Sequence, residues 1–234
     1  MEEILRANLQ RVRERIAAAC RRANRSPDEV TLVAVTKYIP ASVAALLYQL
    51  GQADLGESRP QELWHKAAHL PHARWHLVGH LQRNKVAKTL PLVWLIHSVD
   101  SVRLLDCLER EAARAGSEVH VLLELNLTGE ATKHGFTIEG AEEVLEDPLR
   151  WPHVRMYGLM TMAQVTSDPE TTRPVFRRLR ELRDAWRSRV PPPHCLTELS
   201  MGMSQDYEVA IEEGATLVRI GSALYEGIGE LAHD

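Results

Sequence analysis

Lys37 is the residue of this sequence with the clearest capacity for covalent chemistry. It directly follows the apolar run LVAVT (32–36). In a barrel of parallel strands the chemistry is done where strands end, and an ammonium at an apolar barrel mouth loses its proton more readily than a surface lysine. Lys37 is therefore a candidate for forming a Schiff base with an aldehyde. On position alone, a lysine that extends from a strand end into solvent is the commoner explanation.

The ends of two other apolar runs suit a phosphate group. LSMGMS (199–204) places Ser200 and Ser204 around Gly202, and VRIGSALYEG (218–227) adds Gly221 and Ser222. Ser204 has the form of a helix N-cap, and exposed amides at a helix N-terminus attract anions. A serine before a helix is most often only a cap, so the prediction depends on both segments together. Loops after the seventh and eighth strands are the usual phosphate site of a (β/α)8 barrel, in which the eighth strand closes against the first.

Arg219 interrupts the apolar run of the eighth predicted strand. A guanidinium remains charged and is not buried without a partner. We therefore expect its side chain to point into the barrel mouth or to pair with a buried acid. One candidate partner is the nitrogen of a bound pyridine ring, which an arginine can hydrogen-bond only while that nitrogen is unprotonated. Such a contact would weaken the ring as an electron sink and restrict its reactions.

These residues are positioned by alternating helical and β-rich stretches. Residues 2–24 have the apolar spacing of an amphipathic helix. Helical stretches, including 101–115 and 168–189, follow nearly all of eight β-rich runs: TLVAVTK (31–37), DLGES (54–58), RWHLVG (74–79), VWLIHSV (93–99), VHVLLELN (119–126), VRMYGLMTM (154–162), HCLTELSMG (194–202) and TLVRIGSAL (216–224). This order predicts an α/β fold, a single closed (β/α)8 TIM-type barrel with an extra N-terminal helix. No linker divides the chain, so we expect one domain over 1–234, with 1–25 packed on the barrel.

Composition narrows the function classes. A net charge of -4 argues against nucleic-acid binding, and the Arg-rich stretch 173–189 has the spacing of a solvated helix face. Three widely spaced cysteines predict neither a disulfide framework nor a zinc site. The sequence shows neither a secretion signal nor a membrane-length apolar run, so we expect a cytoplasmic protein that does not bind membranes.

Five closely spaced histidines have the chemistry of metal ligands. They fall across a predicted helix, a loop and a strand, where they need not converge, and we expect no metal site among them: His65, His69, His72, His76 and His80.

Seven motifs in order resemble the YggS/PROSC family of pyridoxal 5′-phosphate (PLP) homeostasis proteins, also called PLP-binding proteins. They are AVTKYIP (34–40), GESRPQEL (56–63), WHLVGHLQRNK (75–85), HSVDS (97–101), GLMTM (158–162), LSMGMSQDYEVAI (199–211) and VRIGSALYEG (218–227). The resemblance implies a barrel like the N-terminal domain of bacterial alanine racemase.

The same resemblance implies roles for individual residues. Lys37 would carry PLP covalently and Arg219 would face the pyridine nitrogen. The phosphate would be surrounded by Ser200, Gly221 and Ser222, with Ser204 nearby and Met201 and Gly202 lining the same turn. Ser58 stands where the family usually has asparagine, which puts its contact with the cofactor in doubt. His80 replaces the family's usual proline.

Three hypotheses about function follow. The first is a PLP carrier or buffer in vitamin B6 homeostasis that does not catalyse, with PLP-dependent apo-enzymes as recipients; we expect it to be a monomer or a weak dimer. The second is an amino-acid racemase, which needs acid/base groups on both faces of the substrate's α-carbon. In alanine racemase relatives one of these groups comes from a second domain, and only about ten residues follow the eighth predicted strand here, against roughly 50 for a small domain. The third is an interaction protein regulated by PLP.

Overall fold

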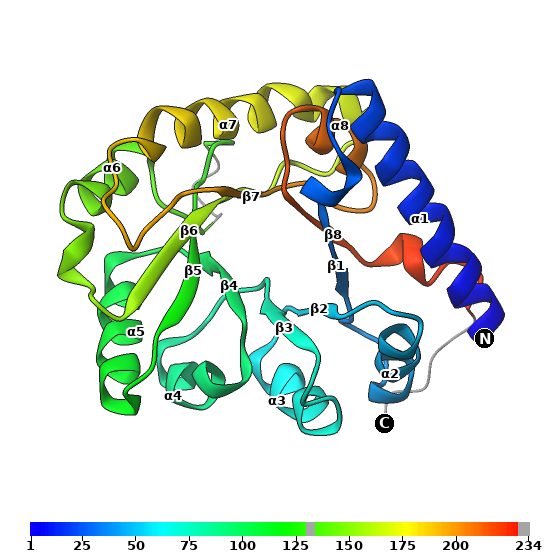
Figure 1. The fold of residues 1–234 in the computed structure, drawn as a ribbon, viewed down its shortest axis with the longest axis horizontal. Helices are drawn as coiled ribbons and strands as arrows, with labels where there is room; N and C mark the ends of the chain where they lie inside the picture. Colours follow the sequence, from blue (N-terminus) through cyan, green and yellow to red (C-terminus); the bar gives the residue numbers. More distant parts are fainter. Residues whose placement is uncertain (130–133, 229–234) are drawn as a thin grey trace.

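The computed structural model describes residues 1–129 and 134–228 of the 234-residue chain. Its strands form one closed, parallel barrel in the order β1 to β8, as the sequence predicts. Figure 1 shows the helices arranged around these strands. The strands are β1 (Thr31–Val35), β2 (Asp54–Glu57), β3 (Arg74–Leu77), β4 (Leu95–Val99), β5 (Val119–Glu124), β6 (Val154–Met160), β7 (Glu198–Ser200) and β8 (Leu217–Ile220).

Most strands are followed by a helix, and a further helix precedes the barrel. The α-helices are α1 (Glu2–Arg22), α2 (Ala41–Gln49), α3 (Pro60–His69), α4 (Val86–Thr89), α5 (Val102–Ala115), α6 (Ile138–Glu146), α7 (Arg173–Arg187) and α8 (Tyr207–Glu212). Short 3-10 turns are η1 (Pro27–Glu29), η2 (Arg83–Lys85), η3 (Leu90–Leu92), η4 (Pro148–Arg150), η5 (Pro169–Thr172) and η6 (Ser222–Leu224). Within the described residues, no helix has the length and apolar character needed to cross a membrane.

The longer helices form because their apolar residues recur on one side. In α7 the buried residues are Phe176, Leu179, Leu182 and Trp186, at the spacing of one helix face. The arginines between them remain outside, as predicted, and several pair with acids of α8 and the turn after it. Burial of one stripe therefore explains both the helix and its Arg-rich surface.

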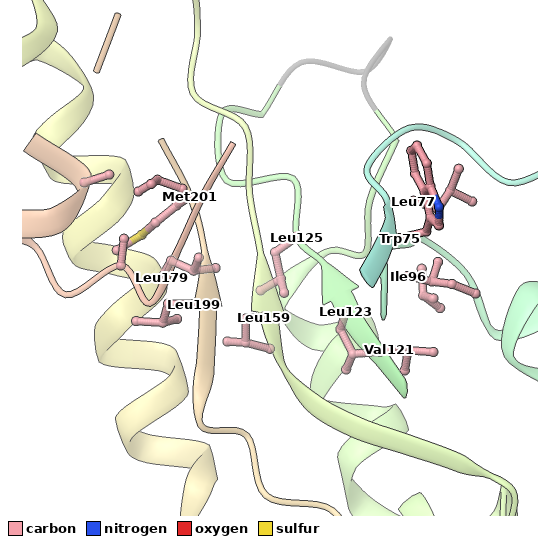
Figure 2. Close-up of a cluster of buried hydrophobic side chains, with 14 of the residues drawn as sticks. Trp75, Leu77, Ile96, Val121, Leu123, Leu125, Leu159, Leu179, Leu199 and Met201 are labelled. Carbon is pink, nitrogen blue, oxygen red and sulfur yellow. The ribbon is translucent and has the colours of Figure 1, made fainter. Parts of the chain in front are cut away.

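The main hydrophobic core lies between the barrel strands and the surrounding helices. Figure 2 shows part of it, in which Leu159, Leu199 and Met201 face the side chain of Leu179 from α7. A second, much smaller apolar cluster consists of Val33, Leu95, Leu122, Met160 and Leu217. These residues lie on strands from around the barrel, so they pack within it and leave the rest of its interior to polar side chains.

All eight strands are shorter than their β-rich runs, and β7 and β8 differ the most. Strand β7 begins at Glu198 instead of residue 194, because three prolines and a left-handed residue, Leu196, precede it. Strand β8 ends at Ile220, and the chain then enters η6 instead of continuing to 224. The late start of β7 lies at the amino end of the barrel, whereas the early end of β8 lies at the mouth, where η6 replaces the predicted strand end.

Helix α1 packs along α8 and η6, as Figure 1 shows. Asn8 on its buried face donates hydrogen bonds to the carbonyls of Leu224 (3.0 Å) and Glu226 (2.8 Å). Arg15 forms an ion pair with Glu208 on α8. The N-terminal helix therefore holds the turn that follows the last strand.

Candidate functional site

A cavity of about 730 Å³ opens at the carboxyl end of the barrel, where strand ends and loops meet. Six of the nine cofactor-binding residues expected from the sequence line it: Lys37, Ser58, Ser204, Arg219, Gly221 and Ser222. The other three, Ser200, Met201 and Gly202, are buried and do not line it: Ser200 contacts Arg219, whereas Met201 packs in the core between the strands and the helices. The two loops and the lysine thus meet as predicted, but part of the β7 loop supports the cavity from below.

The backbone position of Lys37 is fixed by buried hydrogen bonds to Thr36, the residue before it in the chain. Thr36 donates from its hydroxyl to Glu57 (2.7 Å), and Lys66 donates to both the Thr36 carbonyl (2.8 Å) and Glu57 (2.5 Å). The side chains of Glu57 and Lys66 are 1% and 2% exposed. Because Tyr38 then takes a left-handed φ of 67°, the chain turns sharply just after Lys37. Lys37 therefore extends from a fixed backbone position.

The Lys37 ammonium itself has little attachment to the protein. Among the described residues, it lies over the Tyr38 ring, whose centroid is 5.7 Å away, and it makes no hydrogen bond or ion pair. The side chain is exposed to the cavity. An amine without a charged partner is available to a ligand.

Arg219 is almost completely buried, at 4% exposure, yet lines the same cavity. It donates to the Ser200 hydroxyl (2.5 Å) and to the Thr161 carbonyl (3.0 Å). No carboxylate in the described chain forms an ion pair with it. Burial lowers the pKa of Arg219 to about 10, against the opposing charges of Glu124 and Asp206. Of the two alternatives from the sequence, the guanidinium thus points to the barrel mouth instead of pairing with an acid.

A hydrogen-bonded chain leads from Arg219 into the barrel. Ser200 Oγ lies 2.7 Å from His97 Nδ1, and His97 Nε2 lies 2.9 Å from His76 Nδ1. Strands β4 and β7 are not neighbours, so the contact between His97 and Ser200 crosses the interior. Burial, followed by the charges of His76 and Arg219, holds the pKa of His97 well below its usual value. His97 is therefore neutral and carries one ring proton.

The chain ends at a carboxylate, which fixes its direction. His76 Nε2 lies 3.1 Å from Asp54 Oδ1, and Arg74 donates to Asp54 Oδ2 (2.6 Å). Burial would raise the pKa of Asp54, but hydrogen bonds from His76 and Arg74 lower it. If each histidine carries its proton on Nε2, every hydrogen bond of the chain from Ser200 to Asp54 joins one donor to one acceptor. Arg219 thus has its position set by a satisfied network.

The β7 and β8 loops meet in a way that corrects one prediction. Ser204 is not a helix cap, because α8 begins only at Tyr207 with Asp206 at its N-cap. Instead, the Ser204 hydroxyl accepts from the amides of Gly221 (3.2 Å) and Ala223 (3.4 Å). Two backbone N–H groups therefore converge on one oxygen, which is the arrangement that binds an anion.

The residues that support Arg219 from beneath, His76 and His97, were not predicted as site residues from the sequence. The alternation of side chains along a strand could have identified them, because each histidine lies on the same face of its strand as a residue of the barrel interior. His97, for example, comes two residues after Leu95. The partner identities needed the barrel's closure.

Comparison with known proteins places this geometry in a family. The family described as alanine racemase, N-terminal domain, matches residues 7–228. A pyridoxal phosphate homeostasis protein of Aquifex aeolicus is 43% identical over 93% of this chain and 95% of its own length. The human protein of the same name is 35% identical over 93% and 84%.

A solved structure is similar to this chain in both sequence and fold. PipY of Synechococcus elongatus PCC7942, solved with PLP bound, is 34% identical, with a TM-score of 0.79 over 92% of this chain and 99% of that chain. The matches extend through the barrel and include the segments that surround the cavity. This chain therefore belongs to the pyridoxal phosphate homeostasis protein family, within the alanine racemase N-terminal domain family.

Proposed function

We propose that this protein binds PLP covalently at Lys37 and holds it for PLP homeostasis without catalytic turnover. One observation carries the proposal: an amine without a charged partner, a buried guanidinium and two converging amides line or border the same cavity. The PLP-bound PipY structure and the relatives named for PLP homeostasis support it.

The residues present fit the cofactor's three polar parts. The amides of Gly221 and Ala223, with the hydroxyls of Ser204 and Ser222, would hold the phosphate. Arg219 would donate to the pyridine nitrogen. When bound, PLP supplies an aldehyde with which the Lys37 amine can condense, with loss of one water.

Arg219 would also limit what the cofactor can do. A guanidinium with a pKa of about 10 remains protonated at neutral pH, so it can only donate to the ring nitrogen. The groups directly beneath it, the Ser200 hydroxyl and the neutral His97, offer no stronger acid to protonate that nitrogen. An unprotonated ring stabilises a carbanion less well, which favours a carrier over an enzyme.

Two of the titratable groups around the cavity also favour a carrier. Tyr225 donates its hydroxyl to the Val35 carbonyl (3.0 Å), and burial raises its pKa above the usual value. Asp206 is buried and accepts from the Met203 amide (2.6 Å). Neither is a free acid or base, whereas racemisation needs one on each face of the substrate. We expect a cytoplasmic protein with reduced thiols that passes PLP to apo-enzymes.

Borohydride reduction of the purified protein tests the attachment. We expect the label on Lys37 by mass spectrometry, and we expect Lys37→Ala to lose the visible absorption of the bound cofactor. Lys85→Ala is the matched control, since Lys85 lies on η2 and does not line the cavity. Labelling of another lysine with an unchanged spectrum in Lys37→Ala would contradict the proposal.

Exchange of the α-hydrogen of alanine in deuterated water tests the absence of turnover. We expect exchange well below about 1 per second, the low end of ordinary enzymes. Faster exchange that depends on Lys37 would establish the racemase alternative.

A further inference from the structure

A second polar site lies on the same end of the barrel, outside the cavity described above. His80 Nδ1 lies 3.0 Å from Asp100 Oδ2, and His134 Nδ1 lies 3.4 Å from the same oxygen. The two rings stack, with centroids 4.4 Å apart and 18° between their planes. Three side chains from three separate loops therefore direct their coordinating atoms at one point.

The spacing of these atoms matches a metal site. All three potential ligand atoms lie within 4.8 Å of one another, and this is the one such His, Cys, Asp or Glu group found in the described residues. Ligands at about 2.0–2.2 Å in a tetrahedral zinc site are separated from one another by roughly 3.3–3.5 Å. The two nitrogen–oxygen distances are already near this value, so small side-chain rotations would bring the two nitrogens into place.

The carboxylate is prepared for such a role. The Asp100 side chain is 9% exposed, and its other oxygen, Oδ1, accepts a hydrogen bond from the Ser101 hydroxyl (3.0 Å). That bond leaves Oδ2 to the two histidines. A hydrogen bond of this kind orients a ligating carboxylate in known metal sites.

We propose that His80, Asp100 and His134 form a binding site for a divalent transition metal ion such as Zn²⁺. Two imidazoles and one carboxylate suit Zn²⁺ better than Mg²⁺ or Ca²⁺, which prefer oxygen ligands throughout. The three side chains line an open cavity of about 800 Å³, which leaves the fourth position to water or an added ligand.

The surroundings carry charges of both signs. Arg83 and Arg103 line this cavity and oppose a cation. Against them, Glu124 lies near enough that the charge of Asp100 acts on it. Two carboxyl groups and two imidazoles therefore face two guanidiniums, and binding should be of moderate strength. Of the five closely spaced histidines between 65 and 80, only His80 belongs to this proposed metal site, and His76 points into the barrel.

Zinc titration of the untagged, chelator-treated protein tests the site. In competition with a chromophoric chelator, we expect one equivalent of Zn²⁺ to bind. His80→Ala, His134→Ala and Asp100→Asn should each weaken binding about tenfold or more. The titration uses the metal alone, so its outcome does not depend on PLP binding.

The double variant His65→Ala/His69→Ala is the matched control. These exposed histidines lie one turn apart on α3, where such a pair can also bind a transition metal. Their removal should change the affinity less than twofold. Thermal unfolding without metal checks that each variant folds. Failure of the wild type to bind zinc saturably, or loss of binding only in the α3 control, would overturn the proposal.

Discussion

Replacement of Lys66 by methionine should destabilise the protein strongly, because the Lys66 side chain is 2% exposed and pairs with a buried carboxylate. The substitution keeps an unbranched side chain only one atom shorter and removes its charge. It deletes the donor to the Thr36 carbonyl and the partner of Glu57, whose side chain is 1% exposed. The carboxylate must then either remain charged with only neutral donors, the Thr36 hydroxyl and the Ser58 amide, or take up a proton.

The expected loss follows from this burial. Removal of one partner of a buried ion pair costs about 3–5 kcal/mol, because the remaining charge is uncompensated. With a urea m value of about 3 kcal/mol/M, the midpoint of unfolding should fall by about 1–1.7 M. In Glu57→Leu/Lys66→Met no charge remains, and Thr36 can still donate to the Gly56 carbonyl (3.2 Å). The double variant should therefore be more stable than the single one by about 2 kcal/mol or more.

Urea unfolding monitored by circular dichroism measures these differences. Lys88→Met is the matched control: Lys88 is exposed and lies over the Trp64 ring at 4.3 Å, so its loss should cost about 0.5–1 kcal/mol. A loss below about 1 kcal/mol in Lys66→Met, or strict additivity in the double variant, would refute the reasoning.

Two further predictions concern Glu124 and Gly202. Burial, then the charge of Asp100, raises the pKa of Glu124 to about 7 from 4.5. Between pH 4.5 and pH 7, Glu124 is therefore protonated in the folded state and ionised in the unfolded chain. This proton's contribution to stability is complete below about pH 4.5 and lost as pH rises through 7. In buffer with a chelator, the free energy of unfolding of Glu124→Gln should therefore exceed that of the wild type by up to about 3 kcal/mol at pH 8 and by almost nothing at pH 4.5. Equal gains at both pH values in chemical unfolding would count against the pKa shift. Gly202→Ala should cost about 3 kcal/mol or more, because φ is +91° and the new Cβ would lie 2.5 Å from that of Ala210. Gly116→Ala, with φ +62° and no atom within 4 Å, should cost only about 1–2 kcal/mol, and similar losses in the two variants would show that the contact is relieved.

The barrel was predictable from sequence because each strand is short, β-rich and followed by a helical stretch. Arg219 was predictable for a related reason, because a guanidinium within an apolar strand needs a partner or a functional interior. Lys37 stood out only together with the phosphate-suited loops and the family motifs, since position alone favours a solvent-exposed lysine. These inferences use only neighbours along the chain.

Other features depend on contacts between distant segments. Ser204 stands where an N-cap would be expected, yet its hydroxyl meets amides from the next strand's loop. Lys66 looks like a surface residue of α3, and only the packing of α3 on β2 buries it beside Glu57. His97 meets Ser200 because the barrel closes with a diameter that one side chain from each wall can span.

The closure of β1 against β8 also determines when the site can exist during synthesis. Lys37 emerges early from the ribosome, whereas Arg219 and Gly221 are among the last described residues to be made. Asn8 and Leu224, which clasp the turn beyond the last strand, are 216 positions apart. Contacts between such distant positions form late, since a long chain must first be ordered. A nascent chain therefore exposes the reactive lysine before it has a phosphate site, and it should gain affinity for PLP only after its last strand has docked.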